Sequence, residues 1–181
     1  MKTLIISLIL TTIVQAEITA NKLSELSKAK HQDVELIEPL QLFTFARNFE
    51  MKPKFLFHRD PGSIPDSTTT TKLKMKKVNE NLIFISFDLP PLEKPFLVAV
   101  TYDRKTGLYN KYMLTPNGQF RTLKGIAIPQ SRTVHWHVVS PKEPSINIET
   151  YYDKSFTTKE AFLDKEGEIF MVLELNAEAS N

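Results

Sequence analysis

From Leu40 onwards, apolar residues recur at every second position over long stretches, which is the period of a half-buried β-strand. The first long segment predicts a strand with one apolar and one charged face. The positions expected on the apolar face are Phe49, Met51, Phe55 and Phe57, and those expected on the charged face are Glu50, Lys52 and Lys54. Pro53 interrupts the segment and predicts a bulge or an edge position there, because proline cannot donate a ladder hydrogen bond.

The stretch Phe96 to Ile128 predicts three consecutive strands joined by two short turns, a β-meander. The first turn ends in Gly107 and the second contains Asn117-Gly118. A chain that reverses in so few residues needs left-handed backbone geometry, so we expect positive φ at both glycines.

Further strand signals precede and follow this meander, separated by clusters of turn-forming residues. They span Lys72–Lys77, Leu82–Asp88, Arg132–Val139, Ile146–Tyr152, Phe156–Leu163 and Glu168–Leu175. About ten short strands with hairpin-sized connections favour an all-β, antiparallel up-and-down β-barrel, since closure removes exposed edges. A β-sandwich is the alternative, although it would require longer crossover connections.

The alternation also assigns individual side chains to the barrel interior. In the lysine-rich strand, Leu73 and Met75 should face inward while Lys72, Lys74 and Lys76 face water. Trp136 should anchor the core, with Val134 and Val138 on the same face. In the last strand the positions expected on one side are Ile169, Met171, Leu173 and Leu175.

The first residues have the organisation of a secretory signal peptide. A short basic start precedes an apolar run, Leu4 to Val14, that is too short to span a bilayer, and Ala16 is a suitable cleavage site. We therefore expect a signal peptide at 1–16, a polar arm or short helix at 17–39, a barrel at 40–176 and a tail at 177–181. The mature protein is expected to be secreted or periplasmic, with no transmembrane segment.

Composition excludes several classes of function. The chain has no cysteine, so it can form neither a disulfide nor a lipid-modified cysteine. Its formal charge is +2, which becomes +1 without Lys2, and the charged residues are interspersed along the chain. Nucleic-acid binding would require a concentrated basic face, so we expect no nucleic-acid partner.

The meander has a motif-level resemblance to known proteins. Tyr102-Asp103, Thr106 and Tyr109 form a Y-D-x-x-T-x-x-Y pattern, followed by a strand with Gly125 and then a strand with Trp136. This order resembles uncharacterised bacterial secreted families with a lipocalin-like, calycin-type barrel. The resemblance covers Leu40 to Leu175 and implies a barrel of that type, although the Gly-x-Trp of lipocalin first strands is absent near Phe43–Phe49.

Candidate catalytic chemistry is sparse, and no cofactor is expected. His135 and His137 project from the same face of one strand and are candidates for metal ligands or for acid–base groups of a barrel-mouth enzyme, as is His58 in its loop. The carboxyl groups of two acidic pairs near hairpin ends are expected to cap turns and remain solvated. These are Glu149 with Asp153, and Asp164 with Glu166.

The aromatic residues of the strands suggest a binding surface inside the barrel. A barrel of this size either fills itself with side chains or leaves one small apolar cavity. The ligand-binding candidates are Tyr102, Tyr112, Trp136 and Tyr152. The main functional hypothesis is non-enzymatic binding of a small apolar or amphipathic ligand. The alternatives are an envelope structural module that binds a protein partner through the arm or a strand edge, and the barrel-mouth enzyme.

Overall fold

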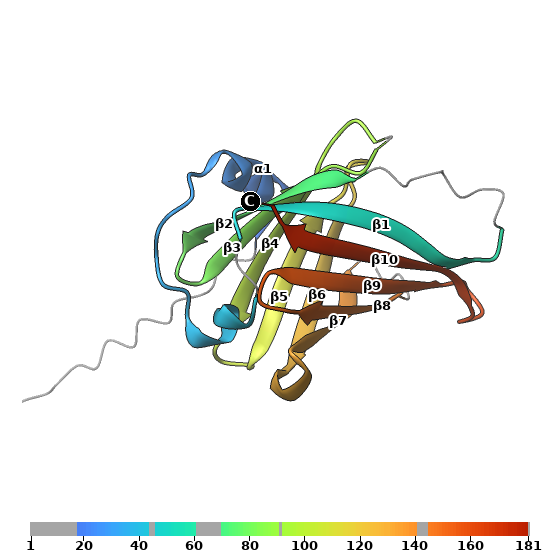
Figure 1. Cartoon of the computed structure of the whole chain (residues 1–181). Helices are drawn as coiled ribbons and strands as arrows, with labels where there is room; N and C mark the ends of the chain where they lie inside the picture. Colours follow the sequence, from blue (N-terminus) through green and yellow to red (C-terminus); the bar gives the residue numbers. More distant parts are fainter. Residues whose placement is uncertain (1–17, 44–45, 61–69, 91, 141–144, 181) are drawn as a thin grey trace, which may run out of the picture.

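The computed structural model describes residues 18–43, 46–60, 70–90, 92–140 and 145–180. Ten antiparallel strands form one closed barrel in the order β1-β10-β9-β8-β7-β6-β5-β4-β3-β2 (Figure 1). Each strand therefore pairs with its neighbours in sequence, and β1 pairs with β10 to close the wall. The predicted up-and-down barrel is confirmed, and the sandwich alternative is excluded.

The strands match the segments that the alternation predicts. Their bounds are β1 Asn48–His58, β2 Thr71–Asn79, β3 Leu82–Phe87, β4 Phe96–Asp103, β5 Leu108–Leu114, β6 Phe120–Ile128, β7 Thr133–Ser140, β8 Ser145–Tyr151, β9 Ser155–Leu163 and β10 Ile169–Ala179. The last strand thus continues to Ala179, and Ala177 is fully buried against the core. Strand pairing therefore extends into the segment expected to be a tail.

The turns of the meander have the geometry that the sequence predicts. Gly107 has φ +71° and Gly118 has φ +86°. The Gly107 amide donates to the Asp103 carbonyl at 2.9 Å, which closes the β4–β5 turn. The register of β4, β5 and β6 is therefore set by local turn chemistry.

The barrel closes unevenly around β1. Pairing with β10 extends from Phe49 to His58, whereas pairing with β2 covers only Asn48 to Met51. Pro53 lies beyond the β1–β2 ladder and pairs with Leu175 of β10 on its other side. The expected edge position of Pro53 is thus observed, because its missing N–H falls where no β2 partner is paired.

Two β-bulges change which side chains face the interior at the ends of β1 and β10, so the orientations differ there from those that the alternation predicts. The register shifts between Phe55 and Phe57, and again between Ile169 and Met171. Each extra residue reverses the alternation. Phe57 was expected to share a face with Met51, and Ile169 with Leu173, but the two side chains are exposed at 47% and 44%.

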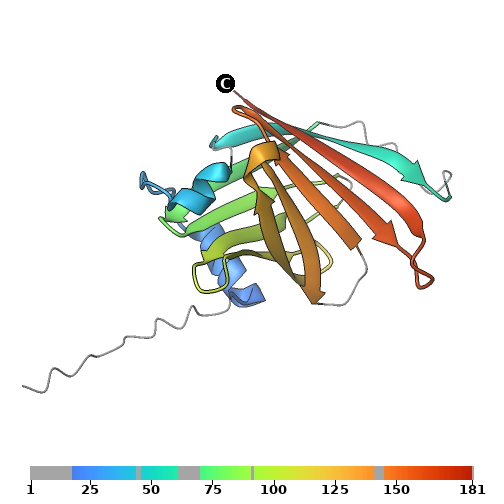
Figure 2. The same ribbon diagram turned by 90° about the horizontal axis from the view of Figure 1, so that it is seen from below.

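A short helix, α1 (Ala20–Lys28), covers the outside of the barrel (Figure 2). Thr19 caps its N-terminus, and Leu23 and Leu26 are buried in a cluster on the outer face of β3, β4 and β5. Lys76 of β2 faces outward as expected but does not point freely into water. Its Nζ donates to the Ser27 carbonyl at 2.8 Å and so satisfies a carbonyl at the helix C-terminus.

A 3₁₀ helix, η1 (Glu38–Leu42), closes one end of the barrel. Leu40 is fully buried and Phe43 is 2% exposed, and both belong to the interior core. The Phe43 ring packs edge-on against Tyr109 and Tyr151, with centroids 5.5 and 4.8 Å apart. The N-terminal arm therefore has an outer part, α1, and a final turn that forms part of the core.

Some sequence predictions concern residues outside the described ranges. They include the signal peptide at 1–16 and positions 61–67 of the loop after His58. Among the described residues, no helix has the length and apolar character needed to cross a membrane.

Replacing Gly107 by valine should lower the free energy of unfolding by about 1–3 kcal/mol, because a β-branched residue is strained at positive φ. The neighbouring exposed Lys105 provides a control, and Lys105→Val should stay within about 0.5 kcal/mol. Denaturant unfolding measures both values. Equal costs at the two positions would contradict the assigned turn geometry.

The closed end should also confer a pH dependence. Tyr109 is buried, its hydroxyl donates to the Pro39 carbonyl at 2.7 Å, and burial raises its pKa from 10.0 to about 12. Between these values the unfolded chain loses a proton that the folded protein keeps, so stability is full below pH 10 and falls as pH rises through about 12.

Tyr109→Phe removes this titrating group. We expect a loss of about 1 kcal/mol at neutral pH from the missing hydrogen bond, together with a shallower fall in stability above pH 10. Urea unfolding across this pH range measures both effects. An unchanged alkaline slope would contradict the role assigned to Tyr109.

Candidate functional site

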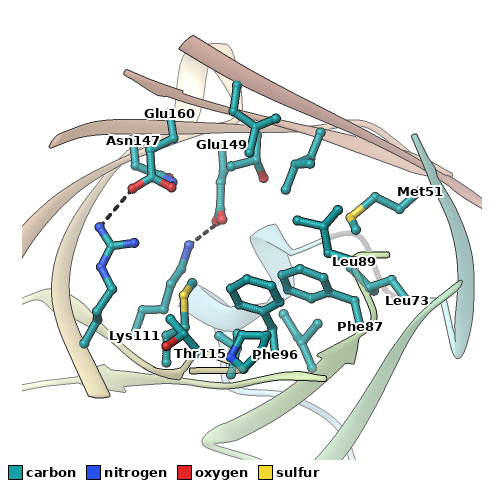
Figure 3. Close-up of a pocket in the computed structure, with 18 of the residues that line it drawn as sticks. Met51, Leu73, Phe87, Leu89, Phe96, Lys111, Thr115, Asn147, Glu149 and Glu160 are labelled. Carbon is teal, nitrogen blue, oxygen red and sulfur yellow. Dashed lines mark hydrogen bonds and ion pairs between the residues drawn. The ribbon is translucent and has the colours of Figure 1, made fainter. Parts of the chain in front are cut away.

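A cavity of about 330 Å³ occupies the half of the barrel opposite η1 (Figure 3). Residues of the β3–β4 connection, Leu89 and Leu92, line it together with Thr115, Pro116 and Asn117 of the β5–β6 turn. These connections lie at the end of the barrel where β3 and β5 terminate. The cavity is therefore at the open end of the barrel.

Most of the cavity wall is apolar. The side chains come from strands on both sides of the β1 closure and from the meander. They are Met51, Leu73, Ile85, Phe87, Phe96, Val98, Met113, Phe156, Phe162, Leu173 and Leu175. Phe87 and Phe96 stack with ring planes 5° apart and centroids 4.7 Å apart, so this part of the wall is a flat aromatic surface.

One polar cluster lies at the inner end of the cavity. Lys111 of β5 forms a buried ion pair with Glu149 of β8, drawn as a dashed line in Figure 3. The other carboxylate oxygen of Glu149 accepts hydrogen bonds from Trp136 Nε1 at 2.7 Å and from the Tyr151 hydroxyl at 2.5 Å. The Lys111 Nζ also lies 4.0 Å from the centroid of the Trp136 ring. Glu149 therefore connects three side chains in the interior.

Burial perturbs the titration of this cluster. It lowers the pKa of the Lys111 ammonium, although the neighbouring Glu149 charge acts in the opposite direction. Burial raises the pKa of Tyr151 well above its usual value, and the Glu149 charge adds to the effect. The Tyr151 hydroxyl thus remains a hydrogen-bond donor to the carboxylate.

A second polar cluster lies beside the first along the same wall. Arg121 of β6 forms an ion pair with Glu160 of β9 at 3.0 Å and also contacts the Ser145 hydroxyl at 3.3 Å. Asn147 Nδ2 donates to Glu160 Oε2 at 3.3 Å. Arg121, Asn147 and Glu160 all line the cavity. The polar wall therefore contains two buried ion pairs.

Strand alternation places these charges inside. Lys111 lies between Tyr109 and Met113 on the inward face of β5, and Asn147 and Glu149 share the inward face of β8. Gly125 of β6 pairs directly with Trp136, and a Cβ at that position would lie 2.6 Å from the indole Cε3. Glycine therefore leaves the space in which the indole ring reaches Glu149.

The position of Glu149 corrects the sequence prediction. It was expected to be a solvated acid near a hairpin end, but it is 8% exposed in the barrel interior. It lies on the same face of β8 as Tyr151, which is why it points inward. Asp153 behaves as expected and forms an exposed ion pair with Arg132 at 2.7 Å. Asp164 caps its hairpin and pairs with Arg59, also at 2.7 Å.

The four aromatic ligand candidates lie in different environments. Trp136 is buried inside the barrel as predicted, between the cavity and the closed end, and Tyr102 packs edge-on against Tyr109 near η1. Tyr112 lies on the outer face in the cluster under α1, and Tyr152 is 52% exposed. None of the four is among the side chains that line the described cavity. Their role in ligand binding remains a prediction.

The histidine candidates are not brought together in the interior. His135 and His137 are exposed on the outer face of β7, and His58 is at the end of β1. Within the described ranges, no group of three or more histidine, cysteine or acidic side chains could hold a metal ion.

Sequence reasoning missed the polar side chains of the cavity, which are the charged Lys111, Arg121, Glu149 and Glu160 and the uncharged Asn147. One signal was available for Lys111, because the same alternation that points Tyr109 and Met113 inward also applies to the lysine between them. Its partner Glu149 lies 38 residues away in the chain, so the pairing itself has no local signal.

Together, the fold and site define a ten-stranded antiparallel barrel whose strands form a complete ring. One end of the barrel is filled by side chains, and the other contains an apolar cavity with ion-paired side chains on one wall. No known family's sequence model matches this chain, and no curated protein is significantly similar to it in sequence.

Loss of one partner of the Lys111–Glu149 pair should be costly, because it leaves a buried charge without its counter-ion. We expect Lys111→Met to lower the free energy of unfolding by about 3–5 kcal/mol. Combining Lys111→Met with Glu149→Gln should restore most of that loss, since no unpaired charge remains. Denaturant unfolding measures all variants.

Lys124→Met is the matched control, because Lys124 is exposed on β6. It should change stability by no more than about 0.5 kcal/mol. If Lys111→Met behaved like Lys124→Met, or if the double variant were as unstable as Lys111→Met alone, the ion pair would not have the importance assigned to it.

Proposed function

We propose that this protein is a non-enzymatic, extracytoplasmic binding protein that holds a small apolar or amphipathic molecule in its barrel. The observation that carries this proposal is the 330 Å³ cavity, with apolar walls on most sides and a few fixed polar groups on one. Ligand pockets have volumes of about 300–1,000 Å³ and the same division between apolar lining and sparse polar groups.

The stable frame around the cavity supports this role. The closed end is filled by η1 and aromatic side chains, and the ion pairs fix the polar wall. A pocket held in place before binding loses little conformational entropy when a ligand enters, which favours affinity.

The other hypotheses have weaker support. An enzyme at the barrel mouth would draw on His135 and His137, which lie on the outer face of β7, or on His58 at the end of β1. None of the three histidines lines the cavity. Strand addition would need an unpaired edge, and barrel closure pairs each strand with neighbours on both sides over at least part of its length. An added strand would have to use a short segment such as 52–58 of β1, which lies beyond the β2 ladder and contains Pro53. Binding of an envelope protein through another surface remains a separate prediction.

The resemblance to secreted lipocalin-like families is part of the proposal. A closed antiparallel ten-stranded barrel is compatible with a lipocalin-like fold. The direct pairing of Gly125 with Trp136, in which glycine leaves room for the indole ring, supports this part of the proposal. Secretion through the expected signal peptide is proposed on the sequence pattern alone.

Binding can be tested with naphthalene, an uncharged apolar probe whose size suits the cavity. Met51 and Met113 line the cavity, so their isotope-labelled methyl groups should shift in NMR spectra as naphthalene is added. Val98→Phe places a larger side chain in the cavity and should weaken binding on the order of tenfold.

Val139→Phe is the matched control, because Val139 is 42% exposed on the barrel surface. It should leave naphthalene binding unchanged, and thermal melting checks that both variants fold. No saturable shift of the two methyl groups in the unsubstituted protein, or equal affinities for the two variants, would contradict binding in this cavity.

A further inference from the structure

The formal charges on the polar wall of the cavity cancel in pairs. Lys111 and Glu149 have side-chain exposures of 4% and 10%, and Arg121 and Glu160 have exposures of 7% and 12%. Each cation thus has a buried carboxylate against it. A charged ligand head placed here would either break one of these pairs or remain buried without a counter-ion, and both are unfavourable.

The two carboxylates also have their oxygens occupied by protein donors. Glu149 accepts from Lys111 on one oxygen and from Trp136 and Tyr151 on the other. Glu160 accepts from Arg121 and Ser145 on Oε1, and from Asn147 on Oε2. A cationic head would therefore have to displace existing hydrogen bonds to reach either carboxylate.

Asn147 presents an acceptor that the described part of the protein does not satisfy. The residue lines the cavity and is 4% exposed, and its Oδ1 is buried without a hydrogen-bond partner among the described residues. Its orientation is fixed by chemistry, because exchanging the amide atoms would place Oδ1 against the Glu160 carboxylate instead of Nδ2. A buried acceptor that receives no hydrogen bond favours a ligand that donates one.

Lys111 supplies a complementary donor on the same wall. An ammonium group has three N–H donors, and Lys111 donates one of them to Glu149 while also lining the cavity. Asn147 and Glu149 are two residues apart on one face of β8, which separates them by about 7 Å along the strand. Figure 3 shows Asn147 and Lys111 on the same side of the cavity, across from Met51 and Leu73.

We propose that the cavity selects an uncharged amphipathic alcohol, whose hydroxyl group donates to Asn147 Oδ1 or accepts from Lys111 Nζ and whose hydrocarbon chain contacts the apolar wall. This inference rests on the proposed binding function and specifies its ligand class. At about 30 Å³ for each water-sized group, a cavity of 330 Å³ holds about eleven non-hydrogen atoms. A straight-chain alcohol of about ten carbons has this size.

The test compares three ten-carbon, straight-chain ligands that differ in the charge of the head: decanol, decanoate and decylammonium. Binding to the purified mature chain at neutral pH is followed by isothermal titration calorimetry and by fluorescence of Trp136, the single tryptophan, which contacts both Lys111 and Glu149. We expect decanol to bind on the order of tenfold more tightly than either charged ligand.

A pair of variants tests the part played by Asn147. Asn147→Leu removes the buried acceptor and should reduce the preference for decanol over decanoate on the order of tenfold. Asn110→Leu makes the same change on the outer face of β5 and should leave the preference intact. Circular dichroism and thermal melting establish that both variants fold, and the comparison of head groups on the unsubstituted protein does not depend on either variant.

The outcomes separate this inference from the proposed function. If decanoate or decylammonium binds as tightly as decanol, the selection for an uncharged head is wrong, while binding in the barrel stands. If none of the three binds and naphthalene produces no saturable shift, the binding function itself fails. An unchanged preference for decanol in Asn147→Leu would overturn the role of Asn147.

Discussion

The interior of this barrel depends on the buried ion pair between Lys111 and Glu149. Two charges removed from water are stable only when their remaining hydrogen-bonding capacity is also used. Here Trp136 and Tyr151 donate to the second oxygen of Glu149, and the Lys111 ammonium lies over the indole ring. The pair therefore determines where two large aromatic side chains lie in the core.

This arrangement divides the interior into two regions. Toward η1, Tyr109, Tyr151 and Phe43 pack edge-on and fill the closed end. Toward the β3–β4 and β5–β6 connections, the side chains do not meet across the barrel, and the cavity remains. The polar groups form the boundary between the regions, so they are both part of the core and part of the cavity wall.

The division of the interior into a packed end and a cavity supports the proposed binding function. Closed packing at one end fixes the strands, and the bulges in β1 and β10 turn Phe57 and Ile169 away from the interior at the other. Neither of these two side chains therefore occupies the interior at that end. A ligand that occupies it contacts aliphatic and aromatic side chains over most of its surface and meets hydrogen-bonding groups on one side only.

Much of the architecture follows from local features of the sequence. Period-two alternation, turn residues such as Gly107 and Gly118, and short connections predict ten antiparallel strands in an up-and-down order. These signals are readable because each involves residues close together in the chain. They also place Leu73, Met75 and Trp136 in the core, where the structure shows them.

The residues of the candidate site could not be predicted from local sequence patterns in the same way. Glu149 looked like a solvated turn residue because nothing near it in sequence neutralises its charge, and its partner Lys111 comes into contact only when the barrel closes. The bulge in β1 and the entry of η1 into the core also depend on contacts with segments that are distant in the chain. The sequence by itself determined the strands, the turns and their order. Tertiary closure alone decided which charges meet in the interior and where space remains, because burial of a charge is favourable only when distant strands supply its partner.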